Sequence, residues 1–223
     1  MLFRQEDTVV SAIEVVDGRK IRIRFDAKKC IHSRGCVLSH PEVFVPNVQG
    51  DWIHPDAAAP EAVAEIAHQC PSGAIVYERL DGGPEEEAPK VNLVRLRENG
   101  PLAFHGALRL AGEAIGLRAT LCRCGASKNK PYCDVSHAGA SFVASGEVAV
   151  KESGALARRD GPLDIRPSAN GPLLVSGSIE VVTGTGKTVN RTVTAAFCRC
   201  GQSANKPYCD GSHARVGFQA AGA

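Results

Sequence analysis

The stretch CRCGQSANKPYCDGSH occupies residues 198–213, and CRCGASKNKPYCDVSH occupies residues 122–137. The two stretches agree at 13 of their 16 positions. Each contains the pattern Cys-x-Cys-x8-Cys-x3-His, so four side chains of the kinds that bind metals recur at identical spacing. Such a repetition indicates two equivalent metal-binding loops.

The repetition extends beyond these loops. The sequence NGPL at residues 99–102 returns at residues 170–173, and a phenylalanine lies five positions after each motif histidine. The second copy is longer by five residues, and we place the excess at residues 183–186, the expected tip of a hairpin. A repeat whose insertion lies in a turn indicates a duplicated structural unit. The TGTGKT stretch at 183–188 belongs to this turn and lacks the first glycine of a phosphate-binding loop.

Each loop offers two pairs of ligands. The first pair, separated by one residue, can bind one metal from a single extended segment. The second pair has an i, i+4 spacing, which on a helix places both side chains on one face. Asp134 and Asp210 are then expected in the first helical turn, where a carboxylate accepts hydrogen bonds from free N–H groups. The expected ligands are Cys122, Cys124, Cys133 and His137 in the first loop, and Cys198, Cys200, Cys209 and His213 in the second.

Three thiolates and one imidazole can hold a tetrahedral zinc ion or a 2Fe–2S cluster. Structural zinc sites usually use cysteines separated by two to four residues. The closer Cys-x-Cys spacing and the division into two pairs favour two irons. Disulfides are disfavoured, because the cysteine count of nine is odd and the start of the chain does not resemble a signal peptide.

The composition excludes several kinds of partner. The net charge of +2 lacks the basic bias of a nucleic-acid-binding protein. No stretch approaches the roughly 20 apolar residues of a membrane span. We therefore expect a soluble, cytoplasmic protein that binds neither nucleic acid nor membrane.

A third group of cysteines, Cys30, Cys36 and Cys70, precedes both loops and has a different spacing. An Asp-Gly pair between apolar runs at 9–16 and 21–25 predicts a hairpin. Apolar residues with a helical period predict a helix over 60–69, and a strand is expected at 74–77. The predicted order is two strands, a cysteine loop, a helix and a strand. The alternative to a metal site is a small core that contains three buried thiols.

The repeated sequence CRCGxSxNKPYCDxSH resembles the CDGSH iron–sulfur motif of mitoNEET-type proteins. The second copy has the signature unchanged at residues 209–213, whereas the first has Val135 in place of glycine. The resemblance implies one 2Fe–2S cluster per loop, with the Cys-x-Cys pair on one iron and the Cys–His pair on the outer iron. Val135 is not a ligand position, so the departure concerns local backbone geometry. Relatives with one motif form intertwined dimers, which predicts here a monomer with an internal pseudo-twofold.

The single histidine ligand predicts the chemistry of each cluster. A neutral imidazole in place of a thiolate makes the cluster less negative and raises its reduction potential. Imidazole also accepts a proton near neutral pH, and the protonated ring is no ligand. The hypothesis is proton-coupled redox chemistry with release of the cluster in acid.

Residues 19–80 resemble a divergent monocluster ferredoxin domain, with Ser33 at the position of the missing middle cysteine. Three thiolates suit a 3Fe–4S cluster directly. A 4Fe–4S cluster needs a further ligand, for which His32 is nearest in sequence and Ser33 next. Trp52 is interpreted as a packing residue. The remaining histidines are expected at the surface or with satisfied hydrogen bonds: His40, His54, His68 and His105.

We therefore predict an α+β protein with a ferredoxin-like domain at residues 1–80, a linker at 81–90, and CDGSH units at 91–142 and 143–223. The two units are expected to be β-rich and pseudo-twofold-related, with short helices at the cluster loops. The predicted function is electron transfer between redox partner proteins through two 2Fe–2S clusters and one 3Fe–4S or 4Fe–4S cluster. The alternatives are storage of clusters or their transfer to apo-protein acceptors, redox or iron sensing, and a zinc-stabilised interaction module. No catalytic constellation stands out, so we do not expect an enzyme.

Overall fold

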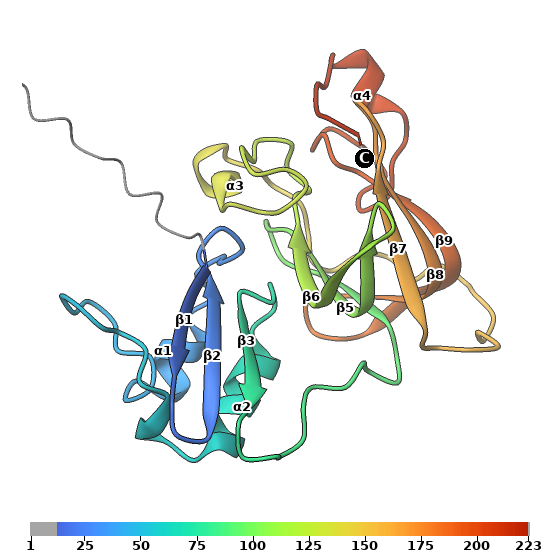
Figure 1. The fold of residues 1–223 in the computed structure, drawn as a ribbon. Coiled ribbons are helices and arrows are strands. Elements are labelled where there is room, and N and C mark those ends of the chain that lie inside the picture. Colours follow the sequence, from blue (N-terminus) through green and yellow to red (C-terminus); the bar gives the residue numbers. More distant parts are fainter. Residues whose placement is uncertain (1–12, 223) are drawn as a thin grey trace, which may run out of the picture.

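The computed structural model describes residues 13–222, whose chain path is drawn in Figure 1. It contains two separate hydrophobic cores. The buried residues of the first core lie between Ile21 and Ile75, and those of the second lie between Val94 and Phe197. Residues 81–92, between the two cores, carry no helix or strand. The chain therefore forms two bodies, drawn in blue to teal and in green to red, joined by an irregular segment.

The first body is a three-stranded antiparallel sheet of order β1-β2-β3, covered by short helices. The predicted hairpin is present at the Asp-Gly pair, although residues 9–12 of its first run lie outside the described residues. The predicted helix over 60–69 is confirmed, and its apolar face is buried. The elements are β1 (Ile13–Asp17), β2 (Ile21–Asp26), α1 (Gly35–Ser39), a 3-10 turn (Pro55–Ala57), α2 (Pro60–Gln69) and β3 (Ile75–Arg79).

The second body is one six-stranded sheet with a short helix after each cysteine loop. Its central path is β4-β5-β7-β8-β9, while β6 pairs with β5 and β4 also pairs with β8. The elements are β4 (Leu93–Leu96), β5 (Leu102–Leu110), β6 (Glu113–Leu121), α3 (Ser136–Gly139), β7 (Pro162–Pro167), β8 (Leu173–Val182), β9 (Thr188–Phe197) and α4 (Ser212–Arg215). The predicted turn at 183–186 joins β8 to β9. No helix within residues 13–222 has the length and apolarity needed to cross a membrane.

The two halves of the repeat exchange strands within this sheet. Strand β4 is antiparallel to β5 of its own half and parallel to β8 of the other, and β7 is antiparallel to β8 and parallel to β5. The registers of the two parallel pairings correspond. Leu93 pairs with Glu180, and Asp164 pairs with Arg109. Asp164 is the counterpart of Leu93 in the second copy, and Glu180 is the counterpart of Arg109, each 71 residues later. Phe104 and Phe197, from different halves, meet edge to face with ring centroids 6.1 Å apart. One core therefore serves both halves.

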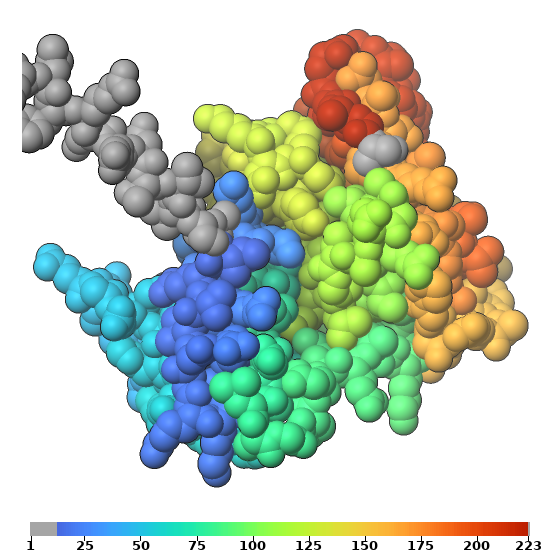
Figure 2. Space-filling view, viewed as in Figure 1, coloured from blue at the N-terminus to red at the C-terminus, as the bar shows by residue number. Residues whose placement is uncertain are grey.

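The two bodies touch at the first cysteine loop (Figure 2). The side-chain amide of Asn129 donates to the carbonyl oxygen of Lys28 at 2.8 Å. The ammonium of Lys29 lies 5.8 Å from the ring centroid of Tyr132, within the range of a cation–π contact. The first CDGSH loop thus lies against the segment that leads from β2 to Cys30.

Candidate metal centres

The Cys-x-Cys pairs are spaced to share a metal. The two sulfurs are 3.7 Å apart in Cys122 and Cys124, and 3.7 Å apart in Cys198 and Cys200. Two sulfurs about 2.3 Å from a tetrahedral metal lie about 3.8 Å from each other. The structure thus brings each pair to the separation that one metal requires.

The Cys–His pairs have the same property. The distance from sulfur to Nδ1 is 3.5 Å between Cys133 and His137 and 3.3 Å between Cys209 and His213. A tetrahedral metal with the usual Zn–S and Zn–N bond lengths would separate these atoms by about 3.5 Å. Among residues 13–222, no three histidine, cysteine or acidic side chains converge on a single ion position. Each loop therefore presents two donor pairs, which fits two metals better than one zinc ion.

The Cys–His pairs do not lie on regular helices, so this part of the sequence-based prediction is wrong. Helix α3 begins at Ser136 and α4 begins at Ser212, each three residues after the cysteine of the pair. The chain turns between cysteine and helix at a residue in the left-handed region, Val135 with φ 69° and Gly211 with φ 85°. This turn, rather than a shared helical face, brings the sulfur and the ring nitrogen together.

The aspartates of the motif also lie before the helices rather than in their first turns. They nevertheless accept backbone hydrogen bonds as predicted: Asp134 accepts from the N–H of Ser136 at 3.0 Å and from that of Lys128 at 2.8 Å. Burial raises the pKa of Asp134, but the hydrogen bonds lower it further, to about 2. At neutral pH the carboxylate therefore links the middle of the loop, at Lys128, to the start of α3, at Ser136.

Val135 is expected to strain the first loop. A β-branched residue in the left-handed region costs about 1–2 kcal/mol, whereas glycine adopts this conformation freely. Val135→Gly should therefore raise the free energy of unfolding by about 1 kcal/mol, measured by urea denaturation. The ligand spacing should be unchanged, since the side chain is not a ligand. A stability equal to or below that of the wild type would contradict this account.

Backbone N–H groups point at the sulfurs in both loops. The amides of Ala126 and Val135 lie 3.4 Å from the sulfurs of Cys124 and Cys133. In the second loop, the amides of Gln202 and Gly211 lie 3.4 Å from the sulfurs of Cys200 and Cys209. Such donors stabilise a thiolate, and they help to set the potential of an iron–sulfur cluster.

The three thiols of the first loop have different pKa values, and a bound cation is needed to ionise all of them. A hydrogen bond from Cys124 lowers the pKa of Cys122 to about 6, whereas the same interaction raises the pKa of Cys124. Burial raises the pKa of Cys133 to about 11. At neutral pH the donor set therefore becomes fully anionic only when a positively charged metal replaces the protons.

The sequence analysis missed a buried arginine beside each site. Arg123 and Arg199, each 1 % exposed, lie between the two cysteines of the Cys-x-Cys pairs. Their Nε atoms donate to the carbonyl oxygens of Gly100 at 3.0 Å and Gly171 at 2.9 Å, which belong to the repeated NGPL segments. Burial lowers the pKa of Arg123 to about 10. The signal in the sequence was an arginine between paired cysteines in both copies.

The phenylalanine after each motif lies close to its arginine. The guanidinium of Arg123 is 5.6 Å from the ring centroid of Phe142, and that of Arg199 is 5.4 Å from that of Phe218. The repeated residues outside the ligand sets thus hold a buried cation next to each Cys-x-Cys pair. This positive charge offsets part of the negative charge of the thiolates.

The two loops lie in direct contact with each other. A Cβ atom added to Gly125 would be 2.7 Å from the carbonyl oxygen of Cys200, and one added to Gly201 would overlap the carbonyl oxygen of Cys124. Both glycines have positive φ, 84° and 80°. The glycine after each Cys-x-Cys pair is therefore needed for the turn and for the approach of the other loop.

The N-terminal cysteines line one cavity of about 410 Å³ in the first body. Cys30, Cys36 and Cys70 contribute to its wall, and burial raises the pKa of the first two. His32 also lines the cavity, with Nδ1 4.0 Å from the sulfur of Cys30. Trp52 packs against Phe25 at 4.9 Å between ring centroids, as expected for a packing residue, and forms part of the same wall.

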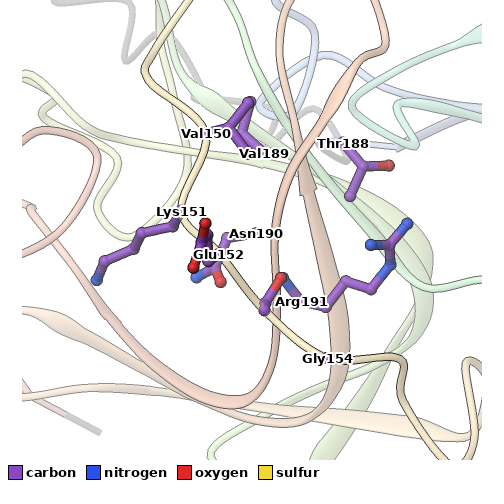
Figure 3. Close-up of a pocket in the computed structure, with 9 residues that line it drawn as sticks. Val150, Lys151, Glu152, Gly154, Thr188, Val189, Asn190 and Arg191 are labelled. Atoms are coloured by element: carbon purple, nitrogen blue, oxygen red, sulfur yellow. The ribbon is translucent and has the colours of Figure 1, made fainter.

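Two of the remaining histidines have hydrogen-bond partners, as expected. His40 pairs with Glu42 at 2.8 Å and His68 with the hydroxyl of Tyr77 at 3.0 Å. A larger cavity, of about 610 Å³, is lined by residues 150–154 and 188–191 (Figure 3). Neither cysteine nor histidine lines it, so it is separate from the candidate metal centres.

Comparisons with known proteins agree with these sites. Residues 99–138 and 170–214 match the family described as iron-binding zinc finger, CDGSH type, and residues 16–80 match the divergent 4Fe-4S mono-cluster family. The chain is also 36 % identical, over 61 residues, to uncharacterized protein YjdI of Escherichia coli K12 and of E. coli O157:H7. That match covers 27 % of this chain and 78 % of the relative. The chain belongs to the CDGSH-type iron-binding proteins, with two such domains in tandem behind a divergent 4Fe-4S mono-cluster domain.

Proposed function

We propose that this protein carries electrons between redox partner proteins through three iron–sulfur clusters and is not an enzyme. The observation that carries the proposal is the pairing of donors in each CDGSH loop at metal-sharing distances, together with a cavity in the first body lined by three further cysteines. Several clusters of different ligation offer several potentials on one chain. A second cluster of different reduction potential on the same chain is useful for moving electrons.

Each CDGSH loop is proposed to hold one 2Fe–2S cluster. The eight ligands are those predicted from the sequence, four for each cluster. In each cluster the Cys-x-Cys pair would bind the inner iron and the Cys–His pair the outer iron. When bound, the cluster supplies a one-electron couple whose potential is raised by the neutral imidazole. The N–H donors at the sulfurs and the buried Arg123 and Arg199 stabilise the negative charge of the ligands.

We further propose a monomer in which the two CDGSH units are related by a pseudo-twofold axis. The exchanged strands β4 and β7 support this proposal, as do the reciprocal contacts of Gly125 and Gly201 with the opposite loop. One chain supplies both halves of a sheet that single-motif proteins build from two. Light scattering should give a mass near 23.5 kDa at low concentration, and a mass twice as large would overturn the proposal.

The third cluster is proposed to bind Cys30, Cys36 and Cys70. Three thiolates suit a 3Fe–4S cluster, whereas the matched family is described by a 4Fe-4S cluster. A 4Fe–4S cluster would need a fourth ligand, and His32 is the nearest candidate, on the wall of the same cavity. The two nuclearities differ in their magnetic properties, so spectroscopy separates them.

Anaerobic purification followed by iron and sulfide analysis and EPR tests these proposals. We expect about seven irons per chain with a 3Fe–4S cluster or about eight with a 4Fe–4S cluster, and about eight acid-labile sulfides in either case. An EPR signal in the oxidised state identifies 3Fe–4S, and a third signal only after reduction identifies 4Fe–4S. Zinc without sulfide, in a colourless protein, would favour the interaction module and overturn the redox proposal.

Storage or transfer of clusters is the second candidate, and the uneven burial of the ligands favours it. Cys122 and Cys198 are 1 % exposed, whereas His137 and His213 are partly exposed. The outer iron would therefore be the accessible one. Mixing the cluster-containing protein with an apo-ferredoxin distinguishes cluster transfer from electron transfer. Movement of iron and sulfide would support transfer, and electron exchange with the iron retained would support the leading proposal.

A further inference from the structure

A cleft of about 510 Å³ separates the first body from the first CDGSH unit. Ser33 and Gln69 line one side, and strands β4, β5 and β6 line the other. Three arginines and two histidines line the cleft, and no aspartate or glutamate does so within residues 13–222. The five are Arg95, Arg97, Arg118, His68 and His105.

The positive charge of this cleft is poorly compensated. Arg118 has a side chain only 4 % exposed and pairs with Glu86 at 2.6 Å. Its Nη1 donates to the carbonyl oxygen of Ala67, while its buried Nε has no partner among the described residues. Neither Arg95 nor Arg97 has a carboxylate within 4.0 Å in the described part of the chain. Three guanidinium groups therefore face one cleft with a single carboxylate in contact.

The second copy of the repeat shows that the fold does not require these cations. The counterparts of Arg97, His105 and Arg118 are Ser168, Ser176 and Thr194. The registers confirm the correspondence, because His105 pairs with Arg118 across β5 and β6, and Ser176 pairs with Thr194 across β8 and β9. The same strands thus form with hydroxyl side chains. These three basic residues therefore occur only in the copy that faces the first body, whereas Arg95 has a basic counterpart, Arg166.

We propose that this cleft binds a small oxyanion, a phosphate ion or the phosphoryl group of a small molecule. The planar guanidinium offers paired N–H donors that match the oxygens of phosphate. An orphaned donor on a buried arginine is costly unless a ligand satisfies it. The volume falls in the range of small-molecule sites.

The position of the cleft connects this site to one cluster loop and not to the other. The backbone carbonyl oxygen of Arg97 accepts a hydrogen bond at 2.7 Å from Arg123, the residue between the two cysteines of the first Cys-x-Cys pair, so Arg97 lies beside the first loop. Its counterpart in the second copy is uncharged. An anion bound at Arg97 would therefore distinguish two loops that are otherwise nearly identical.

Titration calorimetry of the full chain at constant ionic strength tests the proposal, with inorganic phosphate and AMP as separate probes and chloride as the background anion. We expect saturable binding, at least tenfold weaker in Arg97→Ser. The Arg97 side chain makes no hydrogen bond or ion pair within the described residues, so this change should leave the fold intact. Arg166→Ser, at the position equivalent to Arg95 in the second copy, is the matched control and should bind as the wild type does.

The two probes identify the source of the phosphoryl group. Tighter binding of AMP would assign the site to a nucleotide, and equal binding would assign it to the ion alone. His105→Ser provides a second variant, for which weaker binding is also expected. The proposal is overturned if the wild type shows no saturable binding of either probe, or if Arg97→Ser and Arg166→Ser bind equally well.

Discussion

Replacing His213 with cysteine is expected to lower the reduction potential of the second CDGSH cluster by on the order of 100 mV. The Nδ1 of His213 lies 3.3 Å from the sulfur of Cys209, at the spacing of two ligands on one metal. A thiolate in place of the neutral imidazole adds one negative charge to the site, and this charge disfavours the reduced cluster. A redox titration followed by EPR measures the shift.

The first loop and a distant histidine supply the controls for this experiment. His137 remains in place, so the potential of the first cluster should change much less than that of the second. His54→Cys adds a thiol at an exposed position in the first body, away from both CDGSH loops, and should leave both potentials unchanged. Equal potentials in the wild type and His213→Cys would show that the imidazole is not a ligand.

Gly201→Ala is expected to lower the free energy of unfolding by about 3 kcal/mol and to damage both metal centres. About 1–2 kcal/mol comes from the left-handed backbone, since φ is 80°. The remainder comes from the new methyl group, which would overlap the carbonyl oxygen of Cys124 in the other loop. Because that carbonyl belongs to a ligand of the first site, the first loop should also lose iron. Urea denaturation and iron analysis measure the two effects.

Gly211→Ala distinguishes the effect of backbone strain from that of the contact between the two loops. Gly211 also has positive φ, 85°, but a Cβ added there would meet no atom within 4 Å. The free energy of unfolding of this variant should fall by only about 1–2 kcal/mol, the cost of the backbone strain, and the first loop should stay intact. If the two variants lose the same stability and the first loop keeps its iron in both, the contact between the loops has no energetic role.

The parts of the fold that follow from local sequence were predictable. The Asp-Gly pair between alternating runs identified the hairpin, and a helical period identified α2. Ligand spacing predicted the donors of each loop, and the structure brings them together in pairs, because the four donors lie within 16 residues and a short loop can do this. The geometry of the Cys–His pair was not predictable from spacing. An i, i+4 interval fits a helix, whereas here a left-handed residue produces the same proximity outside one.

The sequence alone determined which residues are repeated and which side chains are available as metal ligands. The tertiary structure decided that each half lends a strand to the other, that the two loops touch, and that only one copy faces the first body. These features depend on backbone pairing and packing between residues far apart in the chain, and long-range pairing leaves no periodic signal in either partner. For the same reason the basic cleft could not be predicted: Arg97, which follows β4, and Arg118, in β6, line one cleft only because the sheet lies against the N-terminal body.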